Sequence, residues 1–106
     1  MAKPGERVAA ILSSNDGVVE FIGYGVYVGD YVTHEKVAGF MAHIARETGR
    51  VNPKIVLDNG KDVFGCECWW GPEASVRQML ESEKNVIEVD IDLIRKKLAK
   101  ETSITE

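Results

Sequence analysis

Two cysteines separated by one residue, Cys66 and Cys68, are the first side chains that suggest chemistry. Thiolates bind zinc, and His34 and His43 would complete a set of ligands. The spacing argues against such a site, because zinc ligands usually follow a Cys-x₂₋₄-Cys pattern and the histidines fall on different faces of an expected helix. We therefore expect two free, reduced thiols, with no metal and no cofactor.

A cysteine nucleophile needs a neighbouring base and a lowered pKa. Nothing in the sequence brings His43 to Cys68, and the 17 acidic residues are expected to be mostly solvated charge. No catalytic residue is assigned, and an enzyme ranks behind two classes of binding protein.

The glycines of the run Gly23–Gly29 do not have the spacing of a dinucleotide-binding loop, and no helix follows within the motif. They are more typical of a bent or bulged strand. On a regular strand these glycines share one face with Tyr27 and Tyr31. Such a face would accept a flat ligand or a partner strand.

Trp69 and Trp70 are adjacent, so a regular strand directs them to opposite faces and one of them lies at or near the surface. The alternatives are a lid over the core edge, a subunit contact, or a stacking platform beside a helix start at Gly71–Ser75. Glu73 argues against anion binding at this helix start, because its carboxylate would already lie at the positive end of the helix. The candidate ligand or interface residues are Tyr27, Tyr31, Glu67, Trp69, Trp70 and Pro72.

Two hairpins are predicted to position these residues. Val8–Leu12 and Val18–Val32 are expected strands on either side of a turn at 13–17, and Asn59-Gly60 predicts a two-residue turn between strands at 54–58 and 61–70. In the last of these strands Phe64, Cys66, Cys68 and Trp70 share a face that we assign to the core, whereas Glu67 faces the other way.

Three helices are expected to accompany the strands. The first starts from an N-cap at Thr33, presents Val37, Phe40, Met41 and Ile44 on one face, contains Gly39 and stops at Gly49. The second opens at Pro72 as its first residue. A strand at 86–90 precedes the third, which Asp90 or Asp92 caps.

The pattern predicts an α+β fold with a curved, mostly antiparallel sheet of about five strands and two to three helices. A small SH3-like or partly open barrel is the alternative form of that sheet. The 106 residues predict a single domain over 1–106, with a disordered tail at 101–106. The net charge of −4 argues against nucleic-acid polymers and anionic membranes as partners, and the absence of a signal peptide and the unpaired cysteines suggest the cytoplasm.

Residues 5–12, 23–30 and 54–73 resemble a group of small proteins of bacteria and their phages, and the similarity covers about 5–30 and 52–92. No activity is established for that group, so the resemblance implies no catalytic residue. It implies at most an accessory protein of a mobile element.

Two functions are weighed. The first is a non-catalytic protein that binds a small polar or nucleotide-like ligand at an aromatic surface. The second is a structural or protein-interaction module that self-associates through the same surface, most simply as a dimer. A pocket lined by these aromatic residues would favour the ligand, and a flat apolar patch would favour the partner.

Overall fold

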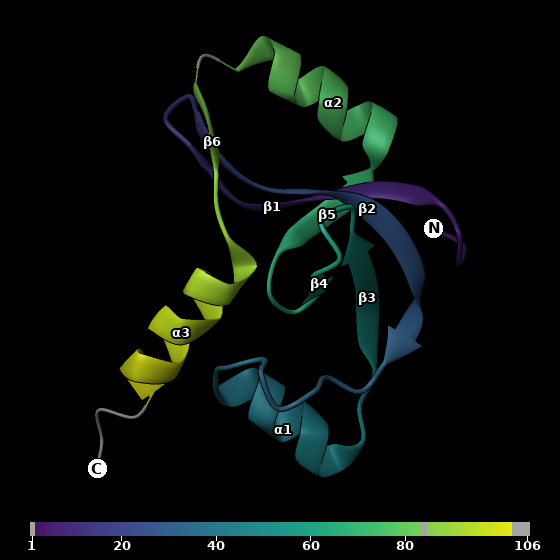
Figure 1. Ribbon diagram of the computed structural model, residues 1–106, viewed down its shortest axis with the longest axis vertical. Coiled ribbons are helices and arrows are strands. Elements are labelled where there is room, and N and C mark those ends of the chain that lie inside the picture. The colour runs from purple at the N-terminus through teal and green to yellow at the C-terminus, as the bar shows by residue number, and fades with distance from the viewer. Residues whose placement is uncertain (1, 84, 103–106) are drawn as a thin grey trace.

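A computed structural model describes residues 2–83 and 85–102. It confirms an α+β fold with a curved, open, mostly antiparallel sheet, and this described part contains six strands and three helices (Figure 1). The elements in chain order are β1 (Arg7–Asn15), β2 (Val18–Tyr31), α1 (Phe40–Thr48), β3 (Asn52–Leu57), β4 (Asp62–Phe64), β5 (Trp69–Pro72), α2 (Glu73–Ser82), β6 (Asn85–Glu88) and α3 (Ile91–Thr102). Residues 101–102 of the expected tail thus end α3, and 103–106 lie outside the described residues.

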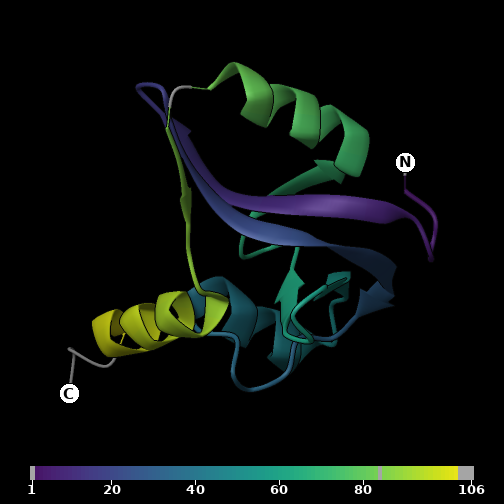
Figure 2. The same ribbon diagram turned by 45° about the horizontal axis from the view of Figure 1, so that its top comes forward.

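The sheet order is β4-β3-β2-β1-β5. No ladder between β4 and β5 closes the sheet among the described strands. The sixth strand, β6, lies outside this order and pairs in parallel with the first half of β2. Helix α2 lies alongside the β1–β2 hairpin, whereas α1 and α3 lie at the other end of the molecule (Figures 1 and 2).

The first hairpin is longer than the sequence predicts, because β1 continues through the serines to Asn15. Asn15 faces Val18 across a two-residue turn in which Asp16 and Gly17 both have positive φ, at 53° and 78°. This is the geometry of a type I′ turn. Register shifts interrupt the β1–β2 ladder twice, and another interrupts the β2–β3 ladder, so the glycine-rich strand is bulged as expected.

The second hairpin pairs β3 with β4 in antiparallel fashion, as predicted, but its loop has a different length. Leu57 N–H donates to the Lys61 carbonyl (2.7 Å), and Gly60 N–H donates back to the Leu57 carbonyl (2.9 Å). Gly60 has a φ of 89°, whereas Asn59 is not among the described residues with positive φ. The loop is therefore Asp58–Gly60, a three-residue turn that ends in a left-handed glycine, and the predicted two-residue turn was wrong.

The first helix starts later than predicted, because Gly39 is its N-cap rather than an interior residue. In the loop before α1, carbonyl groups receive hydrogen bonds from Arg46 instead of from helical N–H groups. The Arg46 guanidinium donates to the carbonyls of Val37 (2.9 Å) and His34 (3.0 Å). Those carbonyls do not need helical partners. The helix buries Ala42 and Ala45 and leaves Phe40 and Met41 exposed, so the predicted apolar face was also wrong.

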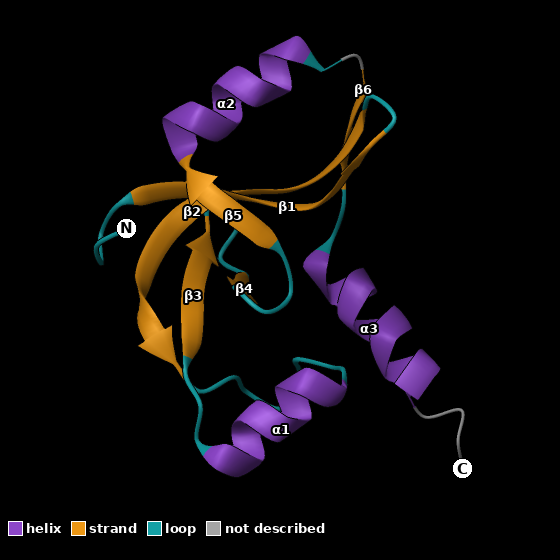
Figure 3. Ribbon diagram, turned by 180° about the vertical axis from the view of Figure 1, so that it is seen from behind, coloured by secondary structure: helices purple, strands orange, loops and turns teal. Residues whose placement is uncertain are grey.

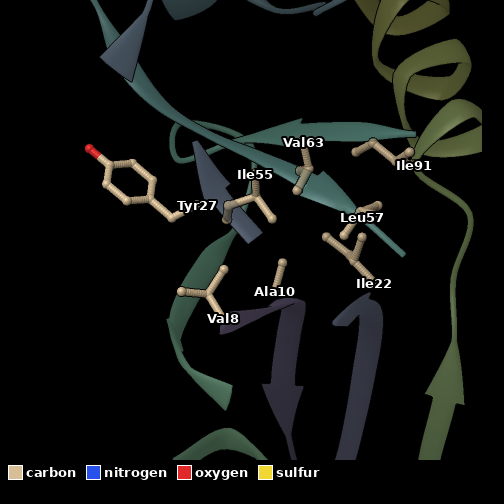
Figure 4. Close-up of a cluster of buried hydrophobic side chains, with 8 residues drawn as sticks. All are labelled: Val8, Ala10, Ile22, Tyr27, Ile55, Leu57, Val63 and Ile91. Carbon is tan, nitrogen blue, oxygen red and sulfur yellow. The ribbon is translucent and has the colours of Figure 1, made fainter. Parts of the chain in front are cut away.

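The sheet buries side chains on both faces because neighbouring residues of β1 alternate between two clusters. One face carries the larger cluster, in which side chains from β1 to β4 and from the start of α3 point toward one another (Figure 4). The other face is covered by α2 through Val76. No helix among the described residues is long and apolar enough to span a membrane.

Candidate functional site

The predicted strand 61–70 is broken, and this break changes the environment of both thiols. Gly65 N–H donates to the Pro53 carbonyl (2.8 Å), and Glu67 N–H donates to the Phe64 carbonyl (2.9 Å), so 65–68 form a turn between β4 and β5. Cys66 is exposed and Cys68 is partly buried. The expectation that both thiols share a buried face with Phe64 was wrong, because that parity requires an uninterrupted strand.

Neither thiol has the properties of a nucleophile. Both cysteines are free. Burial raises the pKa of Cys68 to about 12, and the neighbouring Glu67 carboxylate adds to that effect. Burial and Glu67 also raise the pKa of Cys66 above its ordinary value. A raised thiol pKa means little thiolate at neutral pH, which is the opposite of an activated cysteine.

A buried ion-pair network occupies the space between the broken strand and α3. Arg95 donates from Nε and Nη2 to the two carboxylate oxygens of Glu67 (2.8 Å each), and Nη2 also reaches Asp62 Oδ1 (3.0 Å). The side chains of Arg95 and Glu67 are only 7% and 3% exposed. Phe64 N–H donates to Glu67 Oε1 (3.0 Å), so the carboxylate has partners on both oxygens. Glu67 was predicted to serve a ligand or an interface, but here it anchors α3.

His34 extends this network to the surface. Its Nε2 lies 2.9 Å from Asp62 Oδ1, and its Nδ1 is buried without a hydrogen-bond partner. Burial raises the pKa of Asp62, but the hydrogen bonds from His34 and Arg95 outweigh burial, and the net pKa lies below its usual value. Because Nε2 pairs with Asp62 and Nδ1 is buried, neither ring nitrogen of His34 is placed to accept a proton from a substrate in this arrangement. Its Nε2 is engaged by Asp62 rather than by the thiols, and no group of three or more His, Cys, Asp or Glu suited to a metal occurs among the described residues.

A polar hollow of about 260 Å³ lies beside this network. Most of its charged residues take part in ion pairs, and Lys36 adds a further cation to its lining. Lys61 Nζ contacts Asp90 Oδ1 (2.9 Å) and Asp92 Oδ2 (3.1 Å), while Arg95 and Asp62 are paired as described. Asp90 also accepts a hydrogen bond from the Asp92 N–H, so it is the N-cap of α3 (2.9 Å). These pairings fix α3 to the second hairpin, and Lys36 is the charged lining residue that lies outside them.

Arg95 and Asp62 were not identified from the sequence. The available signal was the position of Arg95, four residues after Ile91 and one after Ile94, on the helix face assigned to the core. A charged side chain on such a face requires a buried partner of opposite charge.

The predicted aromatic site is divided between different surfaces. Tyr27 and Trp70 stack on each other, with ring centroids 5.3 Å apart and an interplanar angle of 24°. The Tyr27 hydroxyl donates to Asp30 Oδ1 (2.6 Å), and Tyr27 is buried. These two rings pack with the larger core cluster and stabilise it. Tyr31 lies near the end of β2, where the Lys54 ammonium sits 5.4 Å from its ring centroid.

Trp69 is the exposed tryptophan, with 54% of its surface accessible. It lines a hollow of about 310 Å³ together with Ile11, Ser13, Ser14 and Met79. Ile11 and Met79 belong to the face that α2 covers, so Trp69 and Trp70 point to opposite faces of the sheet.

The start of α2 does not present a free anion site. Glu73 accepts from Arg7 Nε (2.9 Å) and pairs with Arg77 (3.3 Å), which places a carboxylate at the positive end of the helix. Pro72 is the N-cap rather than the first helical residue, and it is exposed.

A free sheet edge runs beside the Trp69 hollow. The β1–β5 ladder covers Val8 to Ile11, whereas β1 continues to Asn15. On this side, therefore, no described strand pairs with residues 12–15 of β1 (Figure 3). The hollow and the free edge share Ser13 and Ser14.

No family model, curated protein or solved structure matches this chain.

Proposed function

We propose that this chain is a non-catalytic interaction module that binds an extended segment of another protein at the free edge of β1, with Trp69 as its anchor. The observation that supports this proposal is the exposed Trp69 side chain beside unpaired strand residues 12–15. It favours the protein-interaction function over the small-ligand function.

An unpaired strand edge offers main-chain donors and acceptors to an added strand, and neighbouring pockets select alternate side chains of that strand. The hollow of about 310 Å³ has an apolar floor of Ile11 and Met79. It is large enough for one aliphatic or aromatic side chain and lies at the lower limit of small-molecule pockets, roughly 300 Å³. We therefore expect the bound segment to place an apolar residue against Trp69.

The nucleotide-like ligand ranks second in this proposal. Tyr27 and Trp70 stack on each other, so a flat ring would have to displace one of them. Trp69 offers an exposed ring beside a hollow, whereas Tyr31, the other exposed ring of the predicted site, lies outside that hollow. The free thiols and the resemblance to bacterial and phage proteins favour a cytoplasmic accessory protein of a mobile element, and this assignment is part of the proposal.

The experiment is a selection of displayed random dodecapeptides on the immobilised chain, followed by binding measurements on synthetic copies of the selected peptides. We expect peptides with alternating apolar residues whose affinity falls at least tenfold for Trp69→Ala. Tyr31→Ala is the matched control, because Tyr31 is similarly exposed but lies outside the hollow, and it should not change the affinity.

Failure to select peptides, or equal binding by Trp69→Ala, would overturn the proposal. Nucleotides that quench Trp69 fluorescence and bind more tightly than any selected peptide would replace it with the small-ligand function.

A further inference from the structure

Strand β6 forms a second free edge of the sheet, separate from the one beside Trp69. It pairs in parallel with β2 from Val18 to Phe21. Figures 1 and 2 show it at the outer margin of the molecule, and no other described strand pairs with it.

The direction of its backbone groups follows from two hydrogen bonds. Asn85 N–H donates to the Gly17 carbonyl (3.2 Å), and Val89 N–H donates to the Phe21 carbonyl (2.9 Å). In a parallel ladder alternate residues of a strand direct their N–H and C=O groups to the same side. Residues 85, 87 and 89 therefore face β2, and the backbone groups of Val86 and Glu88 face outward.

The side chains of β6 are exposed on both of its faces. Val86 and Ile87 point to opposite faces, and they are 41% and 51% exposed. All four residues of the strand are exposed. An edge strand with apolar residues and open backbone groups is a template for another strand, and proteins usually protect such edges with charge, proline or a cover.

We propose that a second copy of this chain covers the edge by antiparallel β6–β6 pairing about a two-fold axis. A two-fold axis requires one self-complementary patch, and a strand paired antiparallel with its own copy is such a patch. In the register centred on Ile87, Val86 of each copy exchanges main-chain hydrogen bonds with Glu88 of the other.

Charge supports this register. The register centred on Ile87 places Glu88 opposite Val86. The register centred on Glu88 would instead set two carboxylates directly opposite each other. The register centred on Ile87 also brings the two Ile87 side chains face to face, where cross-strand apolar pairs are closest.

The proposal moves the expected dimer contact away from the aromatic residues. The β6 edge lies beyond β2, and the Trp69 hollow lies beyond β1, so the two edges are on opposite sides of the first hairpin. The dimer therefore does not depend on the proposed peptide binding, and either can fail alone. A four-residue ladder is small relative to a standard interface of roughly 1,600 Å², so we expect a weak dimer that dissociates in the micromolar range.

The test is sedimentation equilibrium over a concentration series that spans the micromolar range. The mass of the unmodified chain should rise from 11.7 kDa toward about twice that value. Val86→Pro removes an outward N–H without removing a bond to β2, so the variant should remain monomeric throughout with an unchanged circular dichroism spectrum. Ile87→Glu should also remain monomeric, because it places two carboxylates across the axis, and it tests the proposal if the proline variant does not fold.

Phe40→Glu is the matched control, because Phe40 is the most exposed large apolar residue described and lies on α1. It should dimerise like the unmodified chain. A monomeric mass for the unmodified chain at every concentration would overturn the proposal. Dimerisation that survives both β6 variants, or that is lost in Phe40→Glu or Trp69→Glu alone, would also overturn it by placing the contact elsewhere.

Discussion

Arg95→Met removes the guanidinium at the centre of the buried ion-pair network and keeps most of the apolar stem. In the unmodified chain the guanidinium contacts both carboxylate oxygens of Glu67, and one carboxylate oxygen and the carbonyl oxygen of Asp62. After the substitution the Phe64 N–H is the remaining described partner of the Glu67 carboxylate, which is only 3% exposed. Asp62 keeps His34.

The expected cost is about 3–5 kcal/mol, the range for a buried ion pair that loses one partner. Such a loss is a large part of a total stability of roughly 5–15 kcal/mol. The double variant Arg95→Met/Glu67→Gln should be more stable than Arg95→Met, because the amide leaves no stranded charge. Urea denaturation of the unmodified chain, both single variants and the double variant measures each free energy of unfolding and the coupling between the two sites.

A loss below about 1 kcal/mol for Arg95→Met would mean that the Glu67 carboxylate is not left buried without a partner, because such a carboxylate costs more than that. A double variant as unstable as the sum of the two singles would contradict the expected coupling between the two sites. The pH dependence gives an independent check. The folded-state pKa of Asp62 is lowered, so its contribution to stability is complete above about pH 5 and is lost as the pH falls from its usual pKa of 3.8 through the lowered folded-state pKa. Arg95→Met should reduce that acid dependence.

Three further predictions concern the backbone and the thiols. Gly60→Val should destabilise the fold by about 1–3 kcal/mol in thermal unfolding, because Gly60 has a φ of 89°; an unchanged melting temperature would contradict the loop assignment. Gly25→Ala should cost at least as much, because an added Cβ would clash with the Val56 carbonyl oxygen on β3. A variant as stable as the parent would show that the β2–β3 approach is looser than described. With Ellman's reagent the native chain should show one accessible thiol, Cys66, and one slow thiol, Cys68, with two per chain in denaturant; a fast phase that persists in Cys66→Ser would reverse that assignment.

Local turn chemistry made the hairpins predictable, whereas the length of the second loop depended on a side-chain hydrogen bond within the turn. Asp16-Gly17 forms the expected kind of turn because both residues accept positive φ. At the second hairpin the Asn59 side chain accepts a hydrogen bond from the Lys61 N–H (2.9 Å), and the loop therefore gains a residue. An asparagine side chain can make such a hydrogen bond in any turn. The Asn-Gly dipeptide alone therefore does not distinguish a two-residue loop from a three-residue loop.

The errors in the first helix and in the cysteine strand have a common cause. In each case a distant arginine satisfies groups that the sequence pattern assigned to regular structure. Arg46 bonds the carbonyls before α1, and Arg95 bonds Glu67 in the turn after β4. Periodicity over a short window does not show which remote cation will satisfy a carbonyl or a carboxylate, and tertiary contacts override it.

The candidate site was predictable in its key residue but not in its composition. Adjacent tryptophans on one strand had to face opposite sides, and Trp69 is indeed exposed while Trp70 packs with the core. The sequence did not show that Tyr27 would stack on Trp70, because that contact joins β2 to β5 through their separate pairings with β1. The free edge of β1 depended on the length of β5, which the broken strand set.

NMR titration of a selected peptide into the ¹⁵N-labelled chain locates the peptide-binding surface residue by residue. We expect the largest chemical-shift changes at the amides of residues 12–15 and at the Trp69 indole N–H, with small changes at the Trp70 indole, because Trp70 lies on the other face. Largest changes at α1 or at the polar hollow beside His34, with the Trp69 signal unmoved, would contradict the proposed binding site.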